Sequence, residues 1–366
     1  MAQRSRPPEG RITGREGSSE RPTLRTIANL AGLAVTTVSR ALHDDPGIAM
    51  KTRVRVKELA AEVGYLPDRA ALHLRTGRTY VVSVVLDPHD EILSFGNSLI
   101  RGLTWALRGT PYHLIVTPHF QGEPPLDPVR HLIRNKMADG IIFTHTEPFD
   151  ERIRILTEHG VPFVSHGRSE FSFPHAYVDF DNNAFALEAA RRLIAKGCRH
   201  VAMIAPSRQF SFCQHMRHGF MTAIRESGVA YEIPDDLDLD SPVEKIHAYA
   251  YAASRQPDPV DGFVCGGEVS GLAVMAGVTD AGRDVGTDVH LVVKQTSVVF
   301  DEVRPRVDTI YEDLTEAGQK LGEILLQTIA APENRDLHFL QPPSLTYLDV
   351  ANGGAGGQGG PEIYRA

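Results

Sequence analysis

Residues 23–42 read TLRTIANLAGLAVTTVSRAL, and this stretch decides how the amino-terminal part of the chain folds. Apolar side chains recur at helical spacing before Gly32 and again after it, which predicts two short helices joined by a tight turn. Such a pair can place its second helix in the major groove of DNA, although any hairpin of amphipathic helices has the same pattern. The predicted outer face of the second helix is polar and consists of Thr36, Thr37, Ser39 and Arg40.

Charge favours the DNA-binding interpretation. Residues 1–78 contain 14 Lys and Arg against 8 Asp and Glu, whereas the other 288 residues contain 24 against 38. A head of net charge +6 on a body of −14 is typical of a DNA-binding domain attached to a second function. A disordered basic tail over residues 1–21 is the alternative, but it leaves the basic residues between 25 and 57 unexplained. A third amphipathic segment, residues 52–63, is predicted to complete a three-helix core before Gly64.

The head resembles the headpiece of the LacI/GalR family of bacterial transcription regulators. The resemblance rests on Thr23, on the A-G turn at 31–32, and on the runs TVSR (37–40), KTR (51–53) and GYLP (64–67). It implies that three residues approach base edges: Val35, Thr36 and Arg40. It also implies phosphate contacts from Thr23, Thr37, Ser39 and Thr52.

Two positions depart from this family pattern. Ala34 is found where the family has a Ser that caps the second helix, and losing such a cap typically costs about 1 kcal/mol. Thr26 is found where the family has an Asp, which removes a favourable carboxylate from the start of the first helix. Operator preference therefore does not transfer from relatives.

Residues 67–78 connect the head to the rest of the chain. The run PDRAALHLR (67–75) is too short to form a stable isolated helix, so a plain linker is one interpretation. The family resemblance implies instead a hinge helix that orders on the operator and inserts Leu74 between base pairs in the minor groove. On that hypothesis the DNA contacts also include Arg69, Ala71 and Arg75.

The remaining chain alternates apolar runs with amphipathic stretches, which predicts parallel α/β sheets. The expected strands are Val81–Leu86, His113–Val116, Gly140–Phe143, Val161–Val164, Val201–Ile204, Gly262–Val264 and Val289–Val293. The expected helices lie near 97–108, 127–136, 149–159, 183–196, 214–227, 268–281 and 313–330. About 270 residues suit two such sheets better than one.

This body resembles the periplasmic-binding-protein-like core of the same family, which consists of two Rossmann-like subdomains. The resemblance includes ADGII (138–142), GVPFV (160–164) and GCRHVAMI (197–204). The predicted organisation is a disordered tail (1–21), a helix-turn-helix domain (22–66), a hinge (67–78), a ligand-binding domain (79–347) and a disordered Gly-rich tail (348–366). The first subdomain is expected at about 79–178 plus 309–335, and the second at about 179–308 plus 336–347.

Ligands of open α/β sheets bind beyond the carboxyl ends of the strands. Carboxylates there accept hydrogen bonds from sugar hydroxyls, Arg donates in a fixed fork, and aromatic rings cover an apolar sugar face. The predicted ligand-binding residues are Asp87, Phe95, Glu147, His166, Arg168, Phe212, Arg217, Glu268, Lys294 and Gln295. The family's Asn-Asp is Gly267-Glu268 in this chain, so the ligand has to be inferred from the chain itself.

Other classes of function have less support. Phosphate-binding loops, the GxSxG elbow and HExxH are all missing from the sequence, so we expect no enzyme, no cofactor and no metal. Cys198, Cys213 and Cys265 are odd in number, and with no signal peptide or transmembrane run they indicate reduced thiols in a cytoplasmic protein.

The sequence therefore predicts a homodimeric repressor of carbohydrate uptake or catabolism genes. A sugar would release it from double-stranded operator DNA. The runs HTEP (145–148) and SHGR (165–168) resemble a branch of the family associated with α-glucosides and related oligosaccharides. The alternatives are a solute-binding protein without a transcriptional role, and a regulator that needs a non-sugar co-repressor.

Overall fold

The computed structural model describes residues 22–65, 76–86, 95–119 and 123–348. The chain divides into two compact units, Met1–Arg78 and Thr79–Ala366. The described part of the first unit folds as three helices: α1 (Leu24–Ala31), α2 (Val35–Leu42) and α3 (Met50–Glu62). Their inward side chains, among them Ile27, Val38 and Val56, are fully buried in one small core. The predicted helix-turn-helix head is confirmed.

Gly32 makes the turn between α1 and α2. Its φ of 66° lies in the left-handed region, where glycine has no steric penalty. This conformation lets the Gly32 amide donate to the carbonyl of Ala28 and end α1. The chain then reverses within three residues, because α2 already begins at Val35.

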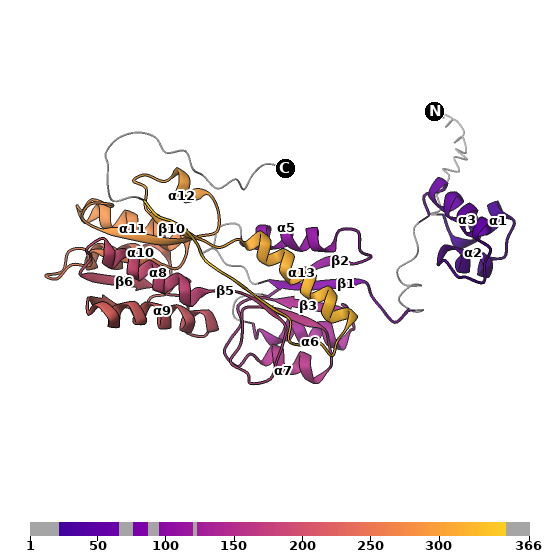
Figure 1. Cartoon of the computed structure of the whole chain (residues 1–366), viewed down its shortest axis with the longest axis horizontal. Coiled ribbons are helices and arrows are strands. Elements are labelled where there is room, and N and C mark those ends of the chain that lie inside the picture. The colour runs from indigo at the N-terminus through magenta and orange to yellow at the C-terminus, as the bar shows by residue number, and fades with distance from the viewer. Residues whose placement is uncertain (1–21, 66–75, 87–94, 120–122, 349–366) are drawn as a thin grey trace, which may run out of the picture. The chain divides into compact units, whose positions relative to one another are not determined.

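The second unit begins with a six-stranded parallel sheet (Figure 1). The strand order is β11-β5-β4-β3-β1-β2. The bounds are β1 (Val81–Leu86), β2 (His113–Pro118), β3 (Gly140–Phe143), β4 (Phe163–His166), β5 (Tyr177–Phe180) and β11 (His338–Gln341). We call this sheet and its helices the first lobe.

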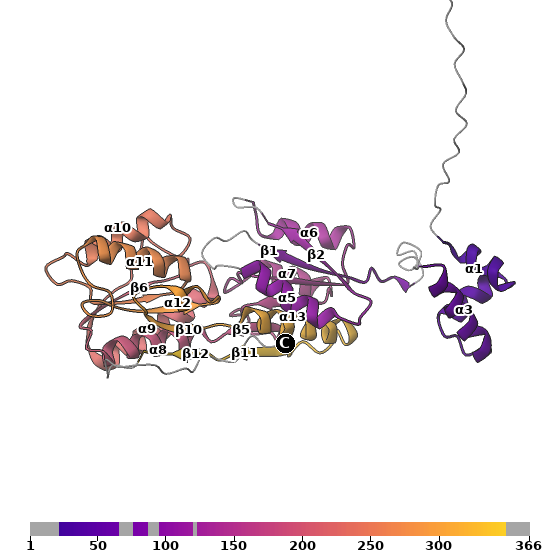
Figure 2. The same cartoon turned by 90° about the horizontal axis from the view of Figure 1, so that it is seen from above.

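Helices cover both faces of the first sheet, as Figures 1 and 2 show. One face packs against α5 (Phe95–Leu107) and α13 (Leu314–Ala330), and the other against α6 (Leu126–Arg134) and α7 (Glu151–Glu158). Alternate residues of each strand supply the two cores, which explains why the strands read as continuous apolar runs. Helices α5 and α13 approach closely because Gly102 and Gly318 lie at their contact. A Cβ on Gly318 would lie 2.2 Å from the carbonyl oxygen of Leu99.

The second lobe repeats this plan. Its sheet has the order β12-β10-β9-β8-β6-β7, and all pairings are parallel except that of β12 with β10. The strands are β6 (His200–Ile204), β7 (Ala230–Glu232), β8 (Gly262–Cys265), β9 (His290–Gln295), β10 (Asp308–Tyr311) and β12 (Ser344–Thr346). The helices are α8 (Asn182–Ala195), α9 (Ser211–Ser227), α10 (Val243–Ala253), α11 (Glu268–Asp280) and α12 (Val299–Glu302). Helices α8 and α9 pack on one face, and α10 and α11 on the other (Figure 1).

The chain crosses between the two lobes three times, after β5, β10 and β11. We had expected residues 336–347 to lie wholly in the second lobe, and that expectation is wrong. Strand β11 pairs with β5 in the first sheet, so the last crossover lies at 342–343. Strand β10 pairs with β9 in the second sheet, so the residues from 309 to 311 belong there and not to the first lobe.

The sequence prediction missed five strands, β5, β7, β10, β11 and β12, and two helices, α10 and α12. The missed strands have three or four residues each, and β7, β11 and β12 are edge strands. Short edge strands carry no long apolar run, because one side of an edge strand is not paired. The predicted fold class, a helical head plus a core of two α/β lobes, is confirmed.

Candidate functional site

The start of α1 is stabilised by a reciprocal pair of threonines. The Thr26 amide donates to Thr23 Oγ1 over 3.3 Å, and the Thr23 amide donates to Thr26 Oγ1 over 3.1 Å. This is a capping box in which Thr26 replaces the usual longer acceptor. Thr26 therefore stabilises the helix start by hydrogen bonds in place of the carboxylate that the family pattern would supply.

Helix α2 presents the residues that were expected to read base edges. Val35 is 40% exposed, and Thr36 and Arg40 are exposed as well. Ala34 at the N-cap makes no side-chain hydrogen bond, so the first amides of α2 are available to an anion such as a DNA phosphate.

The residues expected to contact phosphates surround this face. Thr23 is exposed, whereas Thr37, Ser39 and Thr52 are half-buried. The predicted hinge contacts, Arg69, Ala71, Leu74 and Arg75, lie outside the described residues.

The sequence prediction missed two acidic residues that follow α2. Asp45 Oδ2 accepts from Arg40 Nε over 2.8 Å, and Asp45 Oδ1 accepts from the Gly47 amide over 2.8 Å. These bonds lower the pKa of Asp45, the Arg40 bond contributing most. Asp44 instead holds the Lys57 ammonium, with its Oδ2 at 2.6 Å. Each carboxylate therefore has its own cation within the head.

In the body, aromatic rings from both lobes meet at the carboxyl ends of the strands. Phe95, at the start of α5, lies 5.8 Å from His145 after β3 and 5.8 Å from His166 at the end of β4, measured between ring centroids. From the second lobe, Phe210 lies 5.2 Å and Phe212 6.5 Å from His145. We call these five residues the aromatic cluster. The Ser211 amide also donates to the Thr146 carbonyl over 3.0 Å, which joins the lobes at this point.

His166 is a neutral polar group within this aromatic cluster. Burial lowers the pKa of His166 to about 4, although the Glu312 carboxylate acts in the opposite direction. At neutral pH the imidazole therefore has one donor and one acceptor nitrogen. Phe210 and Phe212 stack nearly parallel, with 8° between their planes. Flat rings next to a neutral donor–acceptor group are suited to an uncharged ligand with an apolar face.

A buried charge network lies beside the aromatic cluster and ties the crossovers together. Lys294 Nζ, at the end of β9, lies 2.6 Å from Glu312 Oε2 and donates to Asn182 Oδ1 over 3.0 Å. Glu312 follows β10 and Asn182 follows β5, so this one ammonium contacts two crossovers. Gln341 joins the third, because its carbonyl accepts from the Asp181 amide and its side chain exchanges hydrogen bonds with the backbone of Asp313.

A second ion pair joins a half-buried arginine that follows β4 to a buried carboxylate on β5. Arg168 Nε lies 2.9 Å from Asp179 Oδ2, and His215 Nδ1 lies 4.0 Å from the same oxygen. Burial outweighs the Arg168 guanidinium and raises the pKa of Asp179 to about 7. The sequence prediction named Arg168 but not its acidic partner, since Asp179 lies inside a strand that it missed.

Two of the predicted ligand-binding residues are used within the protein. Glu268 is fully buried, and its Oε1 accepts from the Thr296 and Ser297 amides over 3.1 and 2.8 Å. Gln295 is 5% exposed and donates to the Ser297 carbonyl. Both side chains position the loop after β9, so their expected contact with a ligand stays a prediction. Glu268 follows the end of β8 and Gln295 is the last residue of β9, but both side chains are buried in the fold.

The other predicted ligand-binding residues differ in burial, and one lies outside the described residues. Glu147 and Arg217 are half-buried, and burial raises the pKa of Glu147. Lys294 is 5% exposed and ion-paired with Glu312, and its ammonium lies 4.6 Å from the centre of the Phe180 ring. Asp87 lies outside the described residues.

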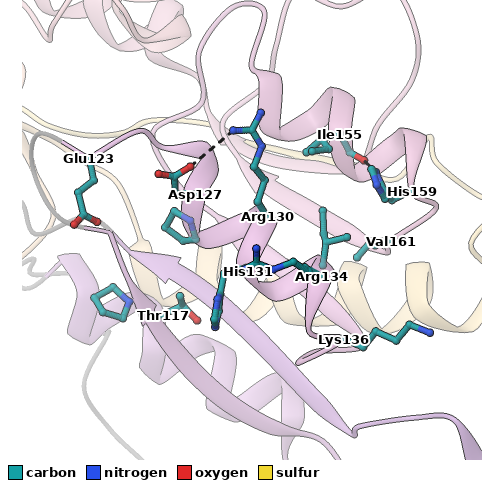
Figure 3. A pocket seen from close by; sticks show the side chains of 13 residues that line it. Thr117, Glu123, Asp127, Arg130, His131, Arg134, Lys136, Ile155, His159 and Val161 are labelled. Atoms are coloured by element: carbon teal, nitrogen blue, oxygen red, sulfur yellow. Dashed lines mark hydrogen bonds and ion pairs between the residues drawn. The ribbon is translucent and has the colours of Figure 1, made fainter.

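A separate cavity of about 1090 Å³ lies on the first lobe between β2, α6 and the end of α7. Figure 3 shows Arg130 paired with Asp127 on one side of it and Ile155, His159 and Val161 on the other. Its described lining residues all belong to the first lobe. This cavity is therefore distinct from the aromatic cluster, where both lobes contribute side chains.

Within the described ranges, no three His, Cys, Asp or Glu side chains are grouped closely enough to hold a metal ion. Cys198, Cys213 and Cys265 are buried. None of the helices in the described part of the chain is long and apolar enough to cross a membrane.

Comparisons with known families agree with both units. Residues 23–68 match "Bacterial regulatory proteins, lacI family", and residues 190–347 match "Periplasmic binding protein-like domain". The chain is 30% identical over 315 residues to the HTH-type transcriptional regulator AglR of Rhizobium meliloti, covering 83% of this chain and 86% of AglR.

Two solved structures share the fold. The transcriptional regulator CelR in complex with cellobiose has a TM-score of 0.63 and 23% identity, with 89% of this chain and 98% of CelR covered. The lac repressor dimer bound to operator and the anti-inducer ONPF has a TM-score of 0.74 and 19% identity, with the same coverage.

Proposed function

The chain belongs to the LacI family of bacterial regulatory proteins, and we propose that it is a homodimeric repressor of carbohydrate uptake or catabolism genes that a sugar releases from its operator. The observation that carries the sugar proposal is the aromatic cluster, to which both lobes contribute rings. A ligand held there contacts both lobes at once, so its binding depends on how they are arranged. A cytoplasmic location agrees with the proposed binding of operator DNA.

On the DNA side, α2 supplies the base-reading residues. Val35, Thr36 and Arg40 are exposed on one helix, as major-groove contact requires. Thr23, Thr37, Ser39 and Thr52 are proposed to contact phosphates, which fix the register but carry no sequence information. The proposal keeps Leu74 as the minor-groove wedge, with Arg69, Ala71 and Arg75 beside it.

On the ligand side, we assign the sugar to the aromatic cluster with Glu147, Arg168 and Arg217 around it. Phe210 and Phe212 offer flat faces to the C–H side of a pyranose ring, and His166 offers one donor and one acceptor to its hydroxyls. The fold relative CelR has been solved with cellobiose. Because His145 and Phe210 are in contact, a sugar enters between the lobes only when these rings separate.

The allosteric step follows from this position. A ligand shifts an equilibrium between two lobe arrangements only through a difference in its affinity for them. Rings from both lobes provide that difference, because only one arrangement places all of them against the sugar. A non-sugar co-repressor bound at the same place would change operator affinity in the opposite direction, so that operator binding becomes stronger when it is added.

An edge of the first lobe is suited to the dimer. Strand β2 is the edge strand, and its Ile115 and Val116 are 43% and 45% exposed, while Trp105 on the neighbouring α5 is 57% exposed. Apolar side chains beside an edge strand are a favourable self-association surface. A two-fold dimer formed there would present two heads to a palindromic operator.

The test combines ligand screening with operator binding. The full chain selects its operator from a random duplex library, and thermal shifts are measured against α- and β-linked glucose disaccharides and galactosides. A sugar that raises the melting temperature should also weaken operator binding at fixed salt. Stronger operator binding would identify a co-repressor, and no thermal shift or operator effect across the panel would overturn the sugar proposal.

A matched pair of phenylalanines locates the site. Phe212→Ala should weaken binding of the active sugar about tenfold, because an aromatic contact is lost. Phe149→Ala removes a ring that is 68% exposed and packs on Phe171, and it should leave sugar affinity unchanged. Equal effects of the two substitutions would contradict the assigned position.

A further inference from the structure

The loop after α2 positions the side chain of Arg40. Asp45 Oδ2 lies 2.8 Å from Arg40 Nε, and the Asp45 amide donates to the Arg40 carbonyl over 3.1 Å. The carboxylate is itself fixed, because Oδ1 accepts from the Gly47 amide over 2.8 Å. Asp45 therefore contacts the arginine at both ends and is oriented by a third residue.

Gly47 leaves the space that this arrangement needs. A Cβ built on Gly47 would lie 2.6 Å from Arg40 Nη2 and 3.1 Å from Asp45 Oδ1. Any larger residue at position 47 would force the guanidinium to move. The guanidinium of Arg40 therefore lies between the Asp45 carboxylate and Gly47.

The hydrogen bond from Arg40 Nε to Asp45 determines which nitrogens of the guanidinium can donate to a base. A guanine presents O6 and N7 in the major groove, and an arginine reads both with two of its N–H groups. When Asp45 accepts from Nε, the terminal nitrogens Nη1 and Nη2 are the pair left to donate to those two atoms. A side chain fixed before binding also loses less conformational freedom on the DNA.

We propose that Asp45 is a positioning residue that holds Arg40 for bidentate recognition of one guanine in each operator half-site. The proposal rests on the proposed function, because it requires Arg40 to face a base. It also explains an acidic side chain next to the helix that enters the groove. A carboxylate there repels phosphates and so lowers affinity for all DNA. A role in discriminating between sequences accounts for its presence despite that loss.

Asp44 provides the matched control. It is the adjacent acid, and its carboxylate pairs with Lys57 and Arg53 on α3 rather than with Arg40. Asp45→Asn and Asp44→Asn remove the same charge from the same loop. Both should bind a scrambled duplex somewhat more tightly than the parent chain, because one repulsion is lost. Only Asp45→Asn should change how bases are discriminated.

The experiment measures affinities of the full chain for its selected operator and for every single base-pair change in one half-site. Arg40→Ala first identifies the base pair that Arg40 reads. At that pair Asp45→Asn should lose about tenfold of the discrimination, within the roughly 5- to 150-fold that a bidentate contact provides, and the other positions should keep theirs. In the Arg40→Ala background, Asp45→Asn should have no further effect on discrimination.

A second variant avoids any change of charge. Gly47→Ala should displace the flexible end of Arg40 at little cost to the fold, and it should reduce discrimination at the same base pair. Discrimination within twofold of the parent in both Asp45→Asn and Gly47→Ala would overturn the proposal. Failure of the parent chain to select any operator would overturn the proposed function instead, so the two failures are distinguishable.

Discussion

The Lys294–Glu312 ion pair makes a sharp prediction about stability. Both side chains are about 5% exposed, and the nitrogen and oxygen lie 2.6 Å apart. Lys294→Met leaves the Glu312 carboxylate buried without its cation, which should cost about 3–5 kcal/mol of unfolding free energy. That is a large share of the roughly 5–15 kcal/mol that keeps a typical domain folded.

The same residue types form an exposed pair that serves as the control. Lys320 Nζ lies 2.9 Å from Glu323 Oε2, and both side chains are 35% exposed. Lys320→Met should cost no more than about 1 kcal/mol, because solvent screens the charges. Urea unfolding of the full chain, followed by circular dichroism, measures both changes.

A double substitution separates the ion pair from the packing of the two side chains. Lys294→Met with Glu312→Gln should cost about 1–3 kcal/mol less than the sum of the single variants, because no buried charge is left without a partner. Equal costs for Lys294→Met and Lys320→Met would refute the reasoning. Strict additivity of the double variant would refute it as well.

Two further predictions concern acid stability and assembly. Burial lowers the pKa of His175 to about 4, whereas the pKa of an unfolded histidine is about 6.5, so the folded state loses stability as pH falls from 6.5 toward 4. In urea unfolding experiments at several pH values, His175→Phe should reduce the stability lost between pH 7 and pH 5 by about 2 kcal/mol. An unchanged pH profile of stability would contradict this prediction. Val116→Glu should weaken dimerisation at least tenfold in sedimentation equilibrium and should weaken operator binding as a result. Val243→Glu, at an equally exposed position on α10, should change neither. A dimer unaffected by Val116→Glu would place the interface elsewhere.

The head could be derived from the sequence almost completely, because its helices follow local rules. The apolar periodicity and Gly32 specify α1, α2 and the turn between them. The Arg40–Asp45 bond could not be derived, since it depends on the path of the loop after α2. Periodicity predicts on which face of a helix a side chain lies. It does not predict which polar atom of a following loop that side chain contacts.

The ligand region was predicted only in part for a similar reason. The rule about strand ends named His166 and Phe212, and the ring distances join both residues to one cluster through Phe95 and His145. It does not say whether a side chain at a strand end points outward or into the fold. Glu268 points inward because the amides of the 296–297 loop require an acceptor, and that loop is remote in sequence.

The three crossovers explain how a small ligand can change the arrangement of large lobes. They are tied to one another by Gln341 and to the second sheet by Lys294, through bonds that are buried and short. A buried ion pair cannot stretch gradually in a medium of low dielectric constant, because its attraction falls off while no water replaces it. The three crossovers are therefore suited to a few discrete lobe arrangements rather than a continuous range. On the proposed function, a sugar held between the rings of both lobes needs only to favour one arrangement, and the crossovers convert that preference into a switch.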